Sequence, residues 1–176
     1  MLTIDELSGR SLGVLAGLGK LRHLLIGKAG RIDVAPLASL KQLEWLGIYH
    51  AQPFSVAPIA GLSRLRQLRT LGSKLVDVSA LAAIPALDFL EITSCDFDDI
   101  SSVARVSSLT KLSLTGTQVS TAEPIVALRK LEYLQINDTQ IRDVTPVFAL
   151  PELRSLVVGK RQCSKALLTR FARERP

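Results

Sequence analysis

Leucine returns in this chain at a fixed interval of 22 residues. Position 1 of the repeat is leucine in successive units: Leu21, Leu43, Leu65, Leu87, Leu109, Leu131 and Leu153. Position 4 is leucine in the same units: Leu24, Leu46, Leu68, Leu90, Leu112, Leu134 and Leu156. Position 6 is aliphatic in every unit except one, where it is Thr70. Because no insertion breaks the interval between residues 21 and 153, the pattern predicts an array of similar stacked units.

Each unit has the pattern of a short strand followed by a short helical turn. Leucine at position 4 and an aliphatic residue at position 6 alternate as residues on one face of a strand do. Apolar residues at positions 14, 17 and 20, such as Val34, Leu37 and Leu40, lie three apart, which favours a tight helical turn. Thr145 before Pro146 predicts a helix N-cap at position 15. A unit of this length is too short for a strand and a full crossover helix, which need about 30 residues.

Both halves of the unit resemble a known family. The segments LTKLSLTGTQV (109–119) and LEYLQINDTQI (131–141) resemble the LxxLxLxxN/T/CxI half of leucine-rich repeats. The segments DVAPLASL (33–40) and DVTPVFAL (143–150) are similar to the other half in the 22-residue internalin-like and phosphatase-regulator-like class. The resemblance implies an α/β solenoid, a right-handed curved leucine-rich repeat horseshoe with a parallel concave sheet and short helical or 3-10 convex segments. It also suggests a bacterial protein.

The repeat predicts how the chain is organised. Residues 1–20 form a partial N-terminal repeat, residues 21–152 form six full repeats, and residues 153–176 form the last repeat strand and a basic amphipathic C-terminal cap. Position 9 departs from the family's usual asparagine, which predicts that Ser and Thr hydroxyls replace an asparagine ladder only in part. The apolar residue that follows is displaced by one in the first two full units, as Ile32 and Phe54, so we expect an irregular edge there.

Side chains at positions 3, 5 and 7 are expected to point outward from the concave sheet, because positions 4 and 6 point inward. These outward positions vary freely, which is typical of a binding surface on a fixed scaffold. Trp45, Phe89 and Tyr133 lie on alternate strands of one column and are either interface anchors or packing residues. The candidate partner-binding residues of the concave face are His23, Trp45, Tyr49, Gln67, Arg69, Phe89, Glu91, Lys111, Tyr133 and Gln135.

Two charged features of this face have alternative interpretations. Arg69 and Glu91 fall on adjacent strands at position 5, and an intramolecular ion pair worth about 0–1 kcal/mol is the simpler interpretation. Lys111 lies between Phe89 and Tyr133, where it is either a cation–π partner or a docking charge for an acidic ligand. The sequence does not separate these two roles.

The net charge of +6 is confined to the end of the chain. Residues 153–176 carry seven basic side chains and one acidic side chain, whereas residues 1–152 are balanced. Ser164, Ala166, Leu167, Leu168 and Phe171 predict a short amphipathic cap that seals the last unit, with its cations near the helix C-terminus. The alternative is a basic patch for nucleic acid or an anionic membrane, for which one short tail gives little support.

The titratable and nucleophilic residues do not form a catalytic group. His23 and His50 are separated by about 16 Å on the expected strand geometry, so they cannot share a metal ion or a proton. Cys95 and Cys163 are about 14 Å apart, too far for a disulfide, and unpaired thiols suit the cytoplasm. The sequence has no phosphate loop, zinc-ligand spacing or nucleophile elbow. We therefore expect no enzyme activity, no cofactor and no metal site.

The N-terminal residues are expected to form an exposed sheet edge. Leu2 and Ile4 fall on strand positions and no capping helix precedes them, so the edge predicts self-association or capture of a partner. Taken together, the sequence predicts a non-enzymatic protein–protein interaction module with no transmembrane segment. We expect it to bind a protein partner on its concave face, as an inhibitor or immunity-type protein or as an adaptor. The alternatives are nucleic-acid or anionic-membrane binding through the tail, and a scaffold subunit of an enzyme complex.

Overall fold

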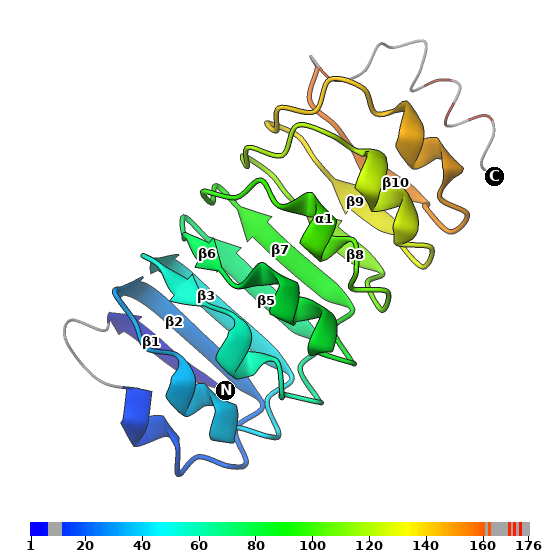
Figure 1. The fold of residues 1–176 in the computed structure, drawn as a ribbon. Helices are drawn as coiled ribbons and strands as arrows, with labels where there is room; N and C mark the ends of the chain where they lie inside the picture. The colour runs from blue at the N-terminus through cyan, green and yellow to red at the C-terminus, as the bar shows by residue number, and fades with distance from the viewer. Residues whose placement is uncertain (7–11, 161, 163–168, 170, 172, 174–176) are drawn as a thin grey trace.

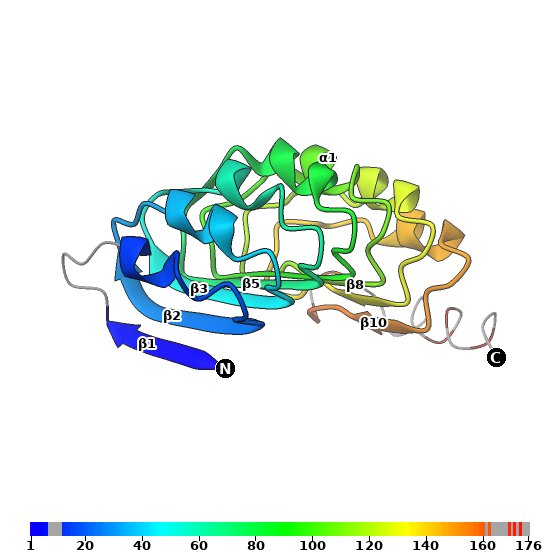
Figure 2. The same cartoon turned by 90° about the horizontal axis from the view of Figure 1, so that it is seen from below.

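The protein is a solenoid of stacked coils in the computed structural model, which describes residues 1–6, 12–160, 162, 169, 171 and 173. The first strand of the sheet (Leu2–Glu6) and the last (Ser155–Val157) lie at opposite ends of the array (Figure 1). Each full coil contributes one strand to a parallel sheet and returns through a short helical segment on the opposite face. Seen along the sheet, the strands line the concave side and the helical turns line the convex side (Figure 2). The expected right-handed horseshoe is confirmed.

The concave layer is one parallel sheet whose strands follow the order of the chain. Its strands are β1 (Leu2–Glu6), β2 (His23–Gly30), β3 (Trp45–Ala51), β5 (Gln67–Leu71), β7 (Phe89–Thr93), β8 (Lys111–Ser113), β9 (Tyr133–Gln135) and β10 (Ser155–Val157). A small second sheet pairs β4 (Phe54–Ser55) with β6 (Leu75–Val76). Position 4 of each unit pairs with position 4 of the next, as Leu68 does with Leu90, so strand register follows the 22-residue period.

The convex layer consists of short helical segments. They are η1 (Leu12–Leu15), η2 (Ala35–Ser39), η3 (Ala57–Ile59), η4 (Val78–Ala83), η5 (Glu123–Ala127) and η6 (Thr145–Ala149), which are 3-10 helices, and α1 (Ile100–Val103), which is α-helical. Proline lies at the first or second helical position of η2, η3, η5 and η6, where a missing N–H costs no helical hydrogen bond. The expected tight turns are therefore present in the described units.

The helix N-caps lie before position 15, at Val144 for η6 and at Asp99 for α1. Thr145 is inside η6, and Asp143 is the residue that accepts hydrogen bonds, through Oδ1, from the backbone N–H (2.9 Å) and the hydroxyl (2.7 Å) of Thr145. Asp99 accepts from the N–H of Ser102 at 3.1 Å in the same way. These bonds lower the pKa of Asp143, and the hydroxyl of Thr145 contributes most. The N-cap prediction at position 15 is therefore wrong, because aspartate at position 13 reaches the free amides first.

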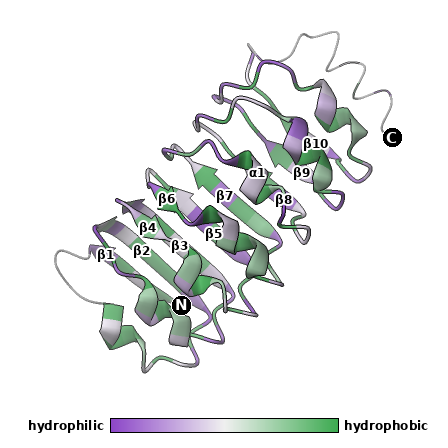
Figure 3. Cartoon of the chain, viewed as in Figure 1, coloured by the Kyte–Doolittle hydropathy of each residue, from purple (hydrophilic) through white to green (hydrophobic). Residues whose placement is uncertain are grey.

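A continuous core runs between the two layers. The inward side chains at positions 4 and 6 are fully buried in every repeat unit from that of β2 to that of β9 of the main sheet, as Leu90 and Ile92 are. Thr70 is buried among them and donates its hydroxyl hydrogen to the carbonyl of Glu91 at 3.2 Å, so its polar atom is satisfied. Hydrophobic residues recur in the strands and helices of each coil (Figure 3). The stacked leucines therefore hold the sheet and the convex turns together.

Some side chains at position 9 form the hydrogen bonds between coils that asparagine usually forms in this family. Ser73 Oγ accepts from the N–H of Ala51 at 3.0 Å, and Cys95 Sγ accepts from the N–H of Ser73 at 3.4 Å. Thr117 and Thr139 instead donate their hydroxyls to carbonyls three residues earlier in their own units. Position 9 therefore ties the middle coils together through Ser73 and Cys95, and Thr139 bonds to the last coil by accepting from Gln162 Nε2, which agrees with the partial replacement that the sequence predicts.

The two ends of the solenoid differ. At the first end, β1 pairs with β2, and Met1 (87% exposed) and Val14 (83% exposed) present apolar surface. Self-association through this edge stays a prediction. At the other end, the Phe171 ring packs 5.2 Å from the ring of Phe148. The rest of the predicted amphipathic cap, including Ser164, lies outside the described residues. Within the described chain, no helix is long and apolar enough to span a membrane.

Candidate functional site on the concave face

The side chains that point outward from the concave sheet form columns across the strands, as the repeat predicts. The position-3 column pairs in register from strand to strand and contains His23, Trp45, Gln67, Phe89, Lys111, Tyr133 and Ser155. The position-5 column runs beside it and contains Leu25, Gly47, Arg69, Glu91, Ser113, Gln135 and Val157. His23 and Lys111 are exposed, and the three aromatic rings of the first column are half-buried. The candidate side chains therefore share one surface.

The position-7 column departs from the expected register at one strand. Tyr49 pairs with Lys28 and not with Gly27, because the pairing of β2 with β3 shifts between Ile26 and Lys28. Gly27 is the extra residue, and a Cβ there would lie 2.6 Å from the carbonyl oxygen of Asp5. In the unit that contains Ile32, the expected irregularity is thus a β-bulge that adds the exposed Lys28 to the concave face beside Tyr49, whereas β3, in the unit that contains Phe54, pairs with β5 without a shift.

Arg69 joins two of the aromatic residues into one cluster, which we call the arginine clamp (Trp45, Arg69, Phe89 and Glu91). The guanidinium carbon of Arg69 lies 4.8 Å from the centre of the Phe89 ring and 6.0 Å from the centre of the Trp45 ring. Arg69 Nε lies 3.6 Å from Glu91 Oε2, so the expected intramolecular ion pair is present. The aromatic rings are therefore neither free surface nor core, since Arg69 covers part of each and leaves the rest open.

Gly47 is a site residue that the sequence reasoning missed. A Cβ at this position would lie 2.7 Å from Trp45 Cη2 and 2.8 Å from Leu25 Cδ1. The indole ring therefore lies against the backbone of its own strand, in space that any side chain at position 47 would occupy. A glycine at an outward position beside a tryptophan was the available signal, because glycine in a strand marks close approach of another group.

We expect Gly47→Ala to lift the Trp45 ring off the sheet without unfolding the protein. The clashing atoms are the far ends of two side chains, which can move, so the free energy of unfolding should change by no more than about 1 kcal/mol. Trp45 is the single tryptophan of the chain, so its fluorescence emission should shift to longer wavelength. Gly61→Ala is the control, because a Cβ there meets only Lys41 Nζ at 3.7 Å. An unchanged emission spectrum of Gly47→Ala would contradict this geometry.

A hollow of about 410 Å³ opens beside the arginine clamp on the same face. Its lining consists of Phe89, Glu91, Thr93, Lys111, Ser113, Thr115, Tyr133 and Gln135. The Tyr133 hydroxyl donates to Gln135 Oε1 at 2.7 Å, and Gln135 Nε2 donates to Asn137 Oδ1 at 3.0 Å, so these side chains hold one another in place. The face thus has an apolar and cationic part at the clamp and a polar part at the hollow.

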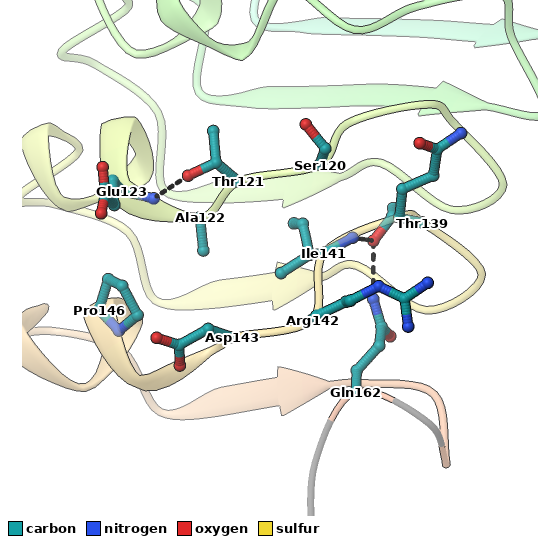
Figure 4. Close-up of a pocket in the computed structure, with 11 residues that line it drawn as sticks. Ser120, Thr121, Ala122, Glu123, Thr139, Ile141, Arg142, Asp143, Pro146 and Gln162 are labelled. Atoms are coloured by element: carbon teal, nitrogen blue, oxygen red, sulfur yellow. Dashed lines mark hydrogen bonds between the residues drawn. The ribbon is translucent and has the colours of Figure 1, made fainter.

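A larger hollow of about 650 Å³ lies away from the concave sheet, on the loops between the fifth and sixth full units (Figure 4). Four of its polar side chains, those of Thr121, Thr139, Asp143 and Gln162, have partners within the protein. Thr121 Oγ1 accepts from the N–H of Glu123 at 3.3 Å, and Thr139 Oγ1 accepts from Gln162 Nε2 at 2.7 Å. Asp143 is held by Thr145 as described above. The larger hollow therefore lies between turns and is separate from the candidate residues of the concave face.

The remaining candidate groups stay apart. His23 begins β2, whereas His50 is the exposed residue before the last residue of β3 and has a positive φ of 56°. Cys95 is buried, and burial raises the pKa of its thiol, which keeps it protonated and unreactive. Cys163 lies outside the described residues. Among the residues that the structure describes, no three histidine, cysteine or acidic side chains come close enough to hold a metal ion.

Comparison with known proteins gives structural neighbours only, since neither a family model nor a curated protein matches the sequence. An internalin, InlF, from Listeria monocytogenes superposes with a TM-score of 0.79 and 28% identity over 92% of this chain and 48% of its own. Internalin C2 from the same species gives 0.64 and 24% over 89% of this chain and 80% of its own. A leucine-rich repeat protein from Leptospira interrogans gives 0.75 and 18% over 97% of this chain and 44% of its own.

These neighbours agree with the resemblance found in the sequence. The chain spans about half the length of InlF and of the Leptospira protein, so it corresponds to only part of either. All three proteins come from bacteria, as the resemblance suggests for this chain. The parallel sheet and the short convex helices of this chain fit the leucine-rich repeat fold of these neighbours. The chain therefore has the leucine-rich repeat fold, and its structure is similar to those of the internalins.

Proposed function

We propose that this chain is a non-enzymatic recognition module that binds a protein partner on its concave face, as an inhibitor or immunity-type protein or as an adaptor. The observation that carries the proposal is the distribution of aromatic residues. The single tryptophan and both tyrosines, Trp45, Tyr49 and Tyr133, all lie half-buried on the concave face. Tryptophan, tyrosine and arginine are the residues that contribute most to protein–protein binding energies. Arg69 adds the third type to the same surface.

The contrast between inward and outward columns also supports the proposal. Inward positions repeat the same leucines and isoleucines, whereas outward positions contain aromatic, charged, amide and hydroxyl side chains in no repeating order. A scaffold needs only the first set, so the second set is free to match a partner. The internalin and leucine-rich repeat neighbours support a protein-interaction module in general terms.

The basic tail gives the alternative functions less support. Most of the cations that would bind nucleic acid or an anionic membrane, including Arg170 and Arg175, lie outside the described residues. No stacking platform accompanies them in the sequence, whereas the concave face has aromatic rings, an arginine and a hollow on one surface. The concave face therefore remains the basis of the proposed function.

Fluorine NMR tests where the partner binds. The chain is labelled with 5-fluorotryptophan, which gives one signal because Trp45 is the single tryptophan. A protein captured from the native lysate is then added until calorimetry shows saturation. We expect the Trp45 signal to shift or broaden, because a partner on the concave face changes the surroundings of the half-buried ring.

The control places the label on the convex layer. In a Trp45→Phe, Ala83→Trp variant, the label lies at an exposed position of η4, and its signal should not change when the partner binds. A shift at position 83 together with an unchanged Trp45 signal in the unmutated chain would place the binding site elsewhere. That result would refute the proposed function.

A further inference from the structure

The Arg69 side chain lies beside two aromatic rings and a carboxylate, but no acceptor among the described residues forms a hydrogen bond with it. Its Nε is buried and makes no hydrogen bond, since the nearest carboxylate oxygen, Glu91 Oε2, lies 3.6 Å away. The side chain as a whole is 37% exposed, so its open part lies beyond the buried Nε. A guanidinium has five N–H donors in a fixed plane, and donors without acceptors are costly once a partner removes water. Arg69 therefore has N–H donors for which a partner can supply the hydrogen-bond acceptor.

The two aromatic rings determine which acceptor suits Arg69. Phe89 and Trp45 lie 4.8 Å and 6.0 Å from the guanidinium carbon, which restricts how the guanidinium plane can turn. A carboxylate matches the paired N–H groups of a fixed guanidinium with two parallel hydrogen bonds. Aspartate and glutamate are the side chains of a protein partner that provide this group.

Lys111 supplies a second cation on the same face. It is exposed, it pairs in register with Phe89 on one side and Tyr133 on the other, and it lines the hollow. No carboxylate within the described residues forms an ion pair with it. Lys111 lies two strands from Arg69 and two residues away along the strand direction, a separation of about 12 Å at ordinary sheet spacings.

The charge balance of the face favours an acidic partner. On the strands from β3 to β10, the outward positions carry the cations Arg69 and Lys111 against the single carboxylate of Glu91. Lys28 on β2 pairs in register with Glu6 on β1 and is left out of this balance. Asp5 lies on β1, three strands from Arg69, a distance of about 14 Å that exceeds the screening length of about 8 Å at physiological salt. The centre of the concave face is therefore positive.

We propose that the concave face selects a partner segment with two acidic side chains about 12 Å apart, with an apolar side chain between them. One carboxylate binds Arg69, the other binds Lys111, and the apolar side chain packs on Phe89. An extended segment covers this distance in three or four residues, at about 3.3 Å per residue. This inference rests on the proposed function, because it identifies the chemistry of the partner at the same site.

Peptide display tests the inference with a defined probe. A random library of linear peptides is selected on the immobilised full chain, and the selected sequences are compared with the starting library. We expect enrichment of peptides with two acidic residues three or four positions apart. Binding of such a peptide should weaken about ten-fold in Arg69→Glu and in Lys111→Glu, because a favourable pairing worth a few-fold becomes a repulsion of similar size. Lys130→Glu, an exposed charge reversal outside the sheet, should leave binding unchanged.

The possible results separate this inference from the proposed function. Selected peptides that depend on Trp45, Phe89 and Tyr133 but carry no acidic pair would overturn the inference and leave concave-face binding intact. Selected peptides that bind equally well without these three rings would overturn both, as would a failure to select any peptide. Equal weakening by Lys130→Glu and Lys111→Glu would show that net charge alone is responsible, which also contradicts the inference.

Discussion

Replacing Leu90 by alanine is expected to lower the free energy of unfolding by about 2–5 kcal/mol, the range for buried leucines. Leu90 is fully buried in β7, in the middle of the sheet, and pairs in register with Leu68 on one side and Leu112 on the other. The truncation opens a cavity between coils, and each coil of a solenoid is stabilised only by its neighbours. Urea unfolding followed by circular dichroism and by Trp45 fluorescence measures the loss.

Lys111→Ala is the matched control for this prediction. It removes an exposed side chain from the strand next to Leu90 and should change the free energy of unfolding by no more than about 0.5 kcal/mol. If Leu90→Ala unfolds at the same urea concentration as the control, the inward column does not hold the coils together. In that case the register derived from the 22-residue period does not describe the packed core.

The sequence was sufficient to predict the register of the sheet. Because successive units have equal length, parallel pairing of like positions places Leu90 beside Leu68 and Leu112, and the structure confirms this alignment. The same period separates inward from outward positions, so the sequence alone assigns Trp45 and Phe89 to the concave face. These predictions needed only periodicity and strand alternation.

Local geometry was less predictable. The bulge at Gly27 leaves the repeat length at 22, so only the displaced Ile32 indicated it. The start of η6 was also misplaced, since Thr145 lies inside the helix and donates its N–H to Asp143; aspartate and threonine are both good acceptors at a helix start, and only geometry decides between them. Such choices depend on differences of about 1 kcal/mol, which residue types alone do not resolve.

The arrangement of the candidate site depends on side-chain conformation. The sequence predicted the ion pair of Arg69 with Glu91, but it did not predict that the guanidinium lies between two rings. Arginine has several rotatable bonds, so its conformation does not follow from its position in the repeat. The position of the Arg69 guanidinium here depends on the Trp45 ring, which occupies the space that a side chain at Gly47 would fill. The arginine clamp could therefore be identified only from the structure.

The second large effect is expected from the concave face itself. Trp45→Ala, Phe89→Ala and Tyr133→Ala in one chain should weaken binding of the captured partner at least about 100-fold, because each removed anchor is worth on the order of 1–2 kcal/mol or more. The three rings are half-buried at the surface and do not belong to the inward columns, so the variant should remain folded. Circular dichroism and the urea midpoint verify this before binding is compared.

A convex variant of equal size is the control for this comparison. Lys41→Ala, Arg105→Ala and Lys130→Ala together remove three exposed side chains from the turns that lead from the convex layer back to the sheet. A partner on the concave face does not contact these turns, so binding to this variant should match binding to the unmutated chain. The pair of variants separates loss of an interface from a general effect of three substitutions.

The dissociation constant of the captured partner for these two folded variants, measured side by side by calorimetry, tests the central claim most directly. Concave-face recognition predicts a loss of at least about 100-fold for the concave variant and no change for the convex variant. Equal affinity of the concave variant and the unmutated chain, or a loss confined to the convex variant, would contradict it.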